Sequence, residues 1–314
     1  MSSKDKISPE EVAARRRRIK TLRLFIQILI LLIINAQIFG AADTGFPVPV
    51  LYPAGAPYTV MVGAYYAFEK TMTSGALPFL ALGVIFLITV VSGRAFCGWA
   101  CPFGLAQDVV GSAPTKKKRP DRITNKDLQF FAQLFLFMSI IIGLYVGWKT
   151  YQGTDADVRE GLGVFSDAPF AVYSPAATLF ATLPYMIGWY PDYEDPIAFT
   201  DFGFIFWLRL LFLIAILYTV AYVPRAFCRW FCPLGLIMGE CGKYSLIGLS
   251  RNPARCDKCG DCEKVCPMGV RILDYPYERV SDTYCILCMD CVAACPKDAL
   301  EITFNVPKKS AEEK

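Results

Sequence analysis

The chain has 314 residues, of which 54% are hydrophobic and 19% are charged, and its mean hydropathy of +0.39 indicates a membrane protein with a modest soluble part. The formal net charge of +4 is small, so the distribution of charge along the chain is more informative than the total. Histidine does not occur, which excludes haem with histidine ligands, Rieske centres, zinc sites built on histidine and a Ser-His-Asp triad in this chain.

The polar residues 1–20 end in four consecutive arginines, a pattern typical of a cytoplasmic anchor in front of a membrane span. Four apolar stretches follow, each long enough to cross a bilayer as a helix with a rise of about 1.5 Å per residue. We predict these transmembrane helices at residues 21–40, 76–93, 128–148 and 202–223.

The charge of the connecting segments orients these spans. Residues 94–127 carry seven Lys and Arg against three Asp and Glu, whereas residues 149–201 carry eight Asp and Glu against two Lys and Arg. Because basic loops stay on the cytoplasmic side, both termini are predicted to be cytoplasmic. We therefore expect a multi-pass protein of the cytoplasmic membrane of a prokaryote, in contact with the lipid bilayer and without a nucleic-acid partner.

A twelve-residue segment occurs twice, and we refer to residues 94–105 as the first motif copy and to residues 225–236 as the second. The copies are identical at nine positions, and each contains a C-x₃-C-P motif. Each copy follows two predicted spans, so residues 21–127 and 128–250 are predicted to be parallel repeats related by an axis along the membrane normal. The four cysteines of the two motifs are Cys97, Cys101, Cys228 and Cys232.

Cysteines four residues apart lie on one face of a helix, and the prolines that follow place each pair where its helix ends. Two such pairs can supply the four thiolates of one iron–sulfur cluster, and Arg94 and Arg225 would offset its negative charge. A redox disulfide and a Cu(I) site are alternatives for the cysteines, and interfacial anchoring is the alternative for the arginines.

Eight more cysteines form two copies of the run C-x₂-C-x₂-C-x₃-C-P, followed by Pro267 and Pro296. This run binds cubane clusters in bacterial two-cluster ferredoxins, where the fourth cysteine of each run ligates the other cluster. Zinc also binds paired C-x₂-C motifs, but it does not require the third closely spaced thiol or the proline. The predicted ligand sets are Cys256, Cys259, Cys262 and Cys295 for one [4Fe–4S] cluster, and Cys285, Cys288, Cys291 and Cys266 for the other.

The predicted fold is thus a membrane α-helical protein with four transmembrane helices in two parallel repeats, followed by an α+β ferredoxin domain of the bacterial 2[4Fe–4S] type. The ferredoxin domain is expected at residues 251–305, ahead of a polar tail at 306–314. Thiolate ligands require a reducing compartment, so this domain should face the cytoplasm. The remaining cysteine, Cys241, is predicted to be buried by packing.

Two C-x₃-C-P motifs after paired spans, followed by a two-cluster ferredoxin, resemble the NapH/NosR-type membrane polyferredoxins of respiratory systems. The resemblance extends over residues 22–302. It implies an electron carrier without haem that connects the quinone pool with other redox subunits of a respiratory complex, and a subunit rather than a stand-alone enzyme. The rival function is that of a membrane assembly factor that uses the C-x₃-C-P cysteines to reduce or deliver copper.

The candidate quinone site rests on two charged residues of the membrane half. Arg209 lies inside the fourth predicted span, where a charge is costly and therefore indicates a cavity or a partner. Arg209 would hold a quinone carbonyl, and Glu69 would accept protons near the external surface. Alternatively, Arg209 extends to the interface or pairs with Asp201.

The charge asymmetry gives the first testable prediction. A reporter fused at Gln152 should be external, whereas reporters fused at Lys117 and Lys314 should be cytoplasmic, because the segment around Gln152 is acidic and the segment around Lys117 is basic. Alkaline phosphatase and fluorescent-protein fusions measure this directly. A cytoplasmic signal at Gln152 would contradict both the four-span arrangement and the parallel repeat.

Overall fold

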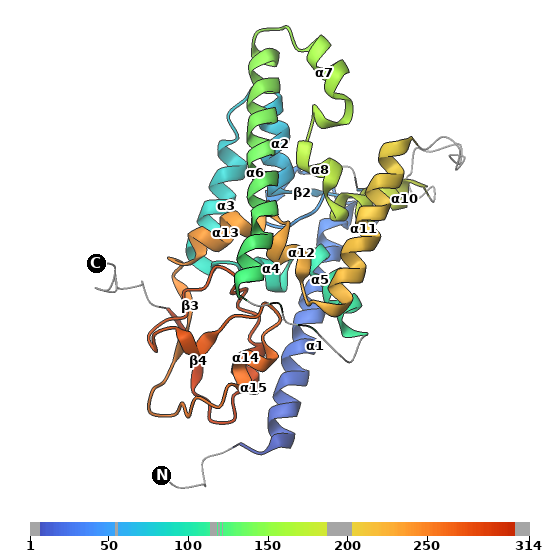
Figure 1. The fold of residues 1–314 in the computed structure, drawn as a ribbon. Coiled ribbons are helices and arrows are strands. Elements are labelled where there is room, and N and C mark those ends of the chain that lie inside the picture. The colour runs from blue at the N-terminus through green and yellow to red at the C-terminus, as the bar shows by residue number, and fades with distance from the viewer. Residues whose placement is uncertain are drawn as a thin grey trace, which may run out of the picture. The chain divides into compact units, whose positions relative to one another are not determined.

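A computed structural model describes residues 7–53, 56–113, 118, 120, 122–186 and 203–304 (Figure 1). The described residues belong to two compact units. The cysteine-rich unit lies within Met1–Gln27, Phe86–Ala100 and Gly235–Lys314. The helical unit lies within Ile28–Ile85 and Cys101–Leu234.

Two helices are long and apolar enough to cross a membrane, by length and composition, in the part of the chain that the structure describes. They are α6 (Arg122–Tyr151) and α11 (Phe204–Tyr222), which coincide with the predicted spans at 128–148 and 202–223. A shorter apolar helix, α3 (Phe79–Ser92), lies within the predicted span at 76–93. The four-span arrangement and the parallel repeat stay predictions.

The predicted first span coincides only partly with helix α1 (Pro9–Ile34). This helix begins inside the segment that was predicted to be a polar tail, because proline at its first position and Glu10 and Glu11 in its first turn favour a helix start there. The chain then forms a 3₁₀ helix, η2 (Ala36–Phe39), which ends at Gly40 in a left-handed conformation.

The helical unit is held together by a close approach of α2 (Ala64–Thr73) to α6. A Cβ atom at Gly147 of α6 would lie 2.2 Å from the backbone oxygen of Met72, so only glycine permits this contact. The approach brings the buried Glu69 of α2 to Ser139 in the middle of α6.

Short elements complete the helical unit. Strand β1 (Phe46–Val48) pairs in parallel with β2 (Met61–Gly63), with Phe46 opposite Met61. The remaining elements of this unit are α5 (Pro102–Ser112), α7 (Ala156–Leu162), η3 (Gly163–Phe165), α8 (Pro169–Tyr173), α9 (Pro175–Ala177), η4 (Thr178–Thr182), α10 (Leu183–Met186) and α12 (Ala226–Trp230). Residues 187–202, which include Asp201, lie outside the described residues.

The cysteine-rich unit is built on an antiparallel pair of strands, β3 (Ile247–Arg251) and β4 (Leu300–Phe304), with Ile247 opposite Phe304. Two short helices, α14 (Asp261–Val265) and α15 (Asp290–Ala294), lie beside the strands in Figure 1. The 3₁₀ helix η6 (Ile272–Asp274) packs against α14.

Two distant segments of the chain complete this unit. They are the first part of α1 and the segment that contains α4 (Ala95–Trp99), and both contact the cysteine loops. Helix α13 (Pro233–Gly242) leads into β3. The cysteine-rich unit therefore includes part of the first motif copy.

Candidate iron–sulfur centres

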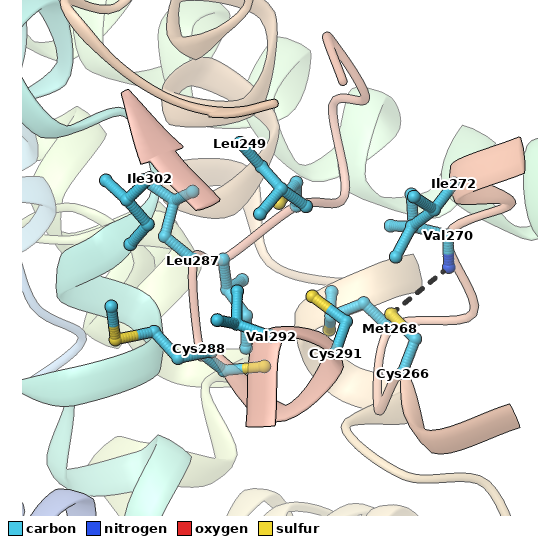
Figure 2. Close-up of a pocket in the computed structure, with 13 residues that line it drawn as sticks. Leu249, Cys266, Met268, Val270, Ile272, Leu287, Cys288, Cys291, Val292 and Ile302 are labelled. Atoms are coloured by element: carbon cyan, nitrogen blue, oxygen red, sulfur yellow. Dashed lines mark hydrogen bonds between the residues drawn. The ribbon is translucent and has the colours of Figure 1, made fainter. Parts of the chain in front are cut away.

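One cavity of the cysteine-rich unit, the second-run cavity, is lined by Cys266, Cys285, Cys288 and Cys291 (Figure 2). Its empty volume is about 420 Å³, and the rest of its wall is apolar, with side chains such as Met268 contributing. Three of the cysteines come from the second run and one from the first. This is the set that crossed ligation predicts.

A second cavity of about 340 Å³, the first-run cavity, is lined by Cys256, Cys259, Cys262 and Cys295. It again combines three cysteines of one run with the fourth of the other. Its wall is more polar, since Arg251, Asp257 and other charged residues contribute to it. The ligation itself stays a prediction, and the structure gathers each predicted set round its own cavity.

Left-handed backbone turns make the cysteines of each run converge. Lys258 and Gly260 have positive φ angles of 57° and 79° between the cysteines of the first run, and Leu287 and Met289 have φ angles of 47° and 63° at the equivalent positions of the second. Three of these four residues are not glycine, so the loops hold them in a conformation that costs about 1–2 kcal/mol per residue. The sequence does not reveal these turns, because neither Lys nor Leu favours them.

The fourth cysteine of each run accepts a hydrogen bond from a backbone amide four residues later. Val270 N–H donates to Cys266 Sγ at 3.4 Å, and Ala299 N–H donates to Cys295 Sγ at 3.3 Å. Such bonds stabilise the negative charge of a ligating thiolate and help to set the reduction potential of a cluster.

The cavities do not favour thiolates without a metal. Burial raises the pKa of Cys262 to about 11 and the pKa of Cys285 to about 12. Burial, followed by the charge of Asp290, also raises the pKa of Cys288. These thiols would be protonated at neutral pH, and a metal must replace their protons when it binds.

The spacing of the cysteines fits a cluster. Among the described residues, no three Cys, Asp or Glu side chains are close enough together to hold a single metal ion. A cubane binds each thiolate at a different iron, so it takes cysteines that surround a cavity, as they do here. When bound, the clusters would supply one-electron redox chemistry.

The two C-x₃-C-P motifs have the same local structure. In each, the first cysteine lies in a five-residue helix, α4 or α12, and the second precedes the proline that begins α5 or α13. All four cysteines are buried, and none of the thirteen cysteines of the chain forms a disulfide. Cys97 belongs to the cysteine-rich unit and the other three belong to the helical unit, so their joint ligation stays a prediction.

Polar partners near the second motif copy were not predicted from the sequence. Gln107 Nε2 donates to Cys228 Sγ at 3.0 Å. Arg225, which is 1% exposed, donates to both carboxylate oxygens of Asp108 at 2.9 and 2.6 Å. The buried Arg225 thus has an ion-pair partner in the protein, the half-buried carboxylate of Asp108. Cys241, in α13, is half-buried.

The two residues of the candidate quinone site, Glu69 and Arg209, each form a hydrogen bond with α8, at the neighbouring residues Phe170 and Ala171. Glu69 is 1% exposed, and its Oε1 accepts hydrogen bonds from Ser139 Oγ at 2.6 Å and from Phe170 N–H at 2.9 Å. Arg209 Nη2 donates to the backbone oxygen of Ala171 at 3.3 Å. Glu69, Phe170 and Ala171 line a cavity of about 290 Å³, and the buried Tyr65, which the sequence did not single out, lines it too.

Two protein families match the regions that these cysteines occupy. A family described as a 4Fe-4S binding domain matches residues 74–120 and 204–241, and one described as a 4Fe-4S dicluster domain matches residues 255–300. The putative electron transport protein YccM of Escherichia coli is 24% identical over 282 residues, which cover 87% of this chain and 69% of that protein. The ferredoxin-type protein NapH of Haemophilus influenzae is 25% identical over 223 residues, which cover 69% and 63%.

The chain is similar to polyferredoxins of the NapH/NosR type. It is also 27% identical to an uncharacterized protein of Methanocaldococcus jannaschii over 251 residues, which cover 77% of this chain and 86% of the relative. No solved structure matches the chain. The predicted carboxy-terminal ferredoxin domain is confirmed, and the chain is an iron–sulfur electron-transfer protein.

Crossed ligation can be tested with one substitution. Cys266→Ala should damage the cluster of the second-run cavity and leave the cluster of the first-run cavity closer to intact. The reason is that Cys266 lines the second-run cavity and not the first-run cavity. Electron paramagnetic resonance of the chemically reduced protein would resolve the two signals. Cys241→Ala, at a cysteine outside both runs, serves as the control. Damage confined to the first-run cluster would contradict crossed ligation.

Proposed function

We propose that this protein is a membrane-bound carrier that passes electrons between the quinone pool and a partner respiratory reductase or redox subunit. The observation that carries the proposal is the pair of cavities, each lined by four cysteines, on a chain that also has helices able to cross a membrane. The name of the relative YccM, a putative electron transport protein, supports it.

The membrane assignment is supported by the apolar surface of the helical unit. In α6, Phe130 and Phe137 are each 58% exposed, and Leu211 of α11 is 64% exposed. Large apolar side chains exposed on two long helices are expected where lipid covers them. We propose that α1 and α3 supply the remaining two spans and that the ferredoxin domain faces the cytoplasm.

The cavity beside Glu69 is proposed as the quinone site. It is lined by aromatic and aliphatic side chains, and the Oε2 atom of Glu69 makes no hydrogen bond within the described residues. Small-molecule sites are mostly apolar with a few placed polar groups, and Glu69 and Tyr65 supply such groups in this cavity. Glu69 would accept protons, and Arg209 would hold the α8 segment through Ala171. Oxidation of one quinol to a quinone releases two protons and two electrons, and two bound clusters would accept these electrons, one each.

A third iron–sulfur centre is proposed at Cys97, Cys101, Cys228 and Cys232. The two segments that match the 4Fe-4S binding family each contain one C-x₃-C-P motif, and the two motifs have the same local structure. The hydrogen bond from Gln107 to Cys228 is of the kind that stabilises a ligating thiolate. Such a centre would add one further one-electron carrier to the two of the ferredoxin domain.

The quinone proposal predicts that a short-chain quinol reduces the clusters of the purified protein under anaerobic conditions. Glu69→Gln should slow this reduction by about tenfold or more, because the amide keeps the hydrogen-bond acceptor for Ser139 but cannot take up a proton. The loss of the oxidised-cluster absorbance measures the rate. Glu160→Gln, the same change at an exposed position, should react like the wild type. A wild-type protein that quinol does not reduce would refute the proposal.

The third centre predicts an excess of iron. The purified protein should hold more than the roughly eight iron atoms that two cubanes contain. The double variant Cys97→Ser, Cys228→Ser should lose the excess and keep both ferredoxin signals, whereas Cys241→Ser should lose nothing. Iron analysis combined with electron paramagnetic resonance tests this. A wild-type protein with full ferredoxin occupancy and no excess iron would leave thiol or copper chemistry for these cysteines.

A further inference from the structure

The two motif copies have nearly the same sequence, but their shared residues have different partners. In the first copy, Arg94 Nη1 donates to the backbone oxygen of Thr283 at 2.7 Å, and Trp99 Nε1 donates to the backbone oxygen of Leu287 at 2.9 Å. Both acceptors belong to the segment 283–288, which we call the cluster loop because it carries Cys285 and Cys288.

The equivalent residues of the second copy have partners within the helical unit. Arg225 pairs with Asp108, and Trp230 Nε1 donates to Asn125 Oδ1 at 2.9 Å. The same arginine and the same tryptophan therefore serve two purposes. In the first copy they hold the cluster loop, and in the second they stabilise the helical unit.

One difference within the copies and one difference three residues beyond them account for this divergence. A Cβ atom at Gly98 would lie 2.6 Å from the backbone oxygen of Ile286, so the cluster loop can approach α4 only because this residue is glycine. The second copy has Arg229 at this position. The position equivalent to Asp108 is Gly239, where a Cβ atom would lie 2.5 Å from Thr283 O and 3.3 Å from Arg94 Nη1.

Helix α1 reinforces the contact between α4 and the cluster loop. Gln27 Nε2 donates to the backbone oxygen of Gly98 at 3.0 Å. One turn earlier, Arg23 forms a buried ion pair with Asp290 at 3.1 Å and lies 3.5 Å from the backbone oxygen of Cys288. One helix thus holds both sides of the contact.

We propose that the first motif copy, and not the second, is the face through which the second-run cluster exchanges electrons with the membrane half of the protein. Each of the two contacting residues directly follows a cysteine: Gly98 follows Cys97, and Ile286 follows Cys285. The short path between the two cysteines is therefore Cys97, Gly98, Ile286 and Cys285. This inference rests on the proposed quinone function, and one electron crosses the contact in each transfer.

The order of the two ferredoxin clusters follows from the same contacts. The second-run cavity is apolar and lies against α4 through the cluster loop. The first-run cavity has the exposed Cys259 and charged side chains in its wall. The second-run cluster is thus the one that exchanges electrons across the contact with α4. The first-run cluster is the one that meets the partner redox subunit.

A matched pair of substitutions tests the proposal on the full chain. Trp99→Phe and Trp230→Phe each remove one indole N–H donor from equivalent positions. Gly98→Ala adds a Cβ atom that collides with the cluster loop, and Gly111→Ala, whose Cβ atom would lie 3.6 Å from Val220 O, is its control. Three properties are measured: hydrogen exchange of the cluster-loop amides, the midpoint potential of each cluster, and the rate of reduction by quinol.

We expect Trp99→Phe to raise hydrogen exchange in the cluster loop about three- to tenfold, as for one lost hydrogen bond, and Gly98→Ala to raise it further. Both should shift the midpoint potential of the second-run cluster alone and slow its reduction by quinol. Trp230→Phe and Gly111→Ala should change none of these. If Gly98→Ala does not fold, Trp99→Phe decides the outcome.

Wild-type values of all three properties in Trp99→Phe and Gly98→Ala would overturn the proposal. Equal effects of Trp99→Phe and Trp230→Phe would also overturn it, because the copies would then be equivalent. If quinol fails to reduce the wild-type protein, the quinone function is refuted. The contact is then still judged by hydrogen exchange and midpoint potential, and unchanged values of both refute it as well.

Discussion

The cysteine-rich unit depends on the electrostatics of buried thiols. Its eight ligand cysteines surround two cavities, and burial raises the pKa of Cys262 and Cys285 far above neutrality. The thiolate form is therefore stable there only when a metal replaces the proton. The ferredoxin part of the unit is small, and its strand pair β3 and β4 has only five residues in each strand. A two-stranded sheet of this size is marginal in water, so cluster binding must provide much of the stability of the unit.

The ferredoxin part gains further support from segments of the same unit that are distant in the sequence. Residues of α1 and α4 reach the cluster loop through Arg23, Arg94 and Trp99, whose donors bond to backbone oxygens or to Asp290. A backbone oxygen next to a ligand cysteine cannot move without moving the ligand. The hydrogen bonds therefore fix the position of the second-run cysteines as well as the position of the loop. These contacts bring Arg23, Arg94 and the indole N–H of Trp99 to the second-run side, whereas Arg251 and other charged residues line the first-run cavity, so the two clusters would have different electrostatic environments.

The sequence predicted the ferredoxin cysteines because the ligand spacing follows from the chemistry of a cubane, which every chain must satisfy in the same way. It also placed α6 and α11 well, since the apolar length of a span is fixed by the bilayer. It missed features that depend on tertiary contact. The left-handed turns at Lys258 and Leu287 are imposed by the loops against residue preference, and the approach of α2 to Ser139 depends on Gly147. The early start of α1 was available in Pro9 and Glu10, but the polar composition of the tail obscured it.

A duplicated motif allows one copy to specialise while the other keeps a structural role. In the second copy, Arg225 and Asp108 form a two-bond ion pair in which the arginine is almost fully buried. Removing the carboxylate of Asp108 would leave the buried guanidinium of Arg225 without its counter-charge and would therefore destabilise the helical unit. The position equivalent to Asp108, three residues after the second copy, is Gly239, and Arg94 of the first copy is directed to a backbone oxygen instead. A contact with the backbone does not depend on the side chain of Thr283, so the cluster loop can vary in sequence while its position against α4 is preserved.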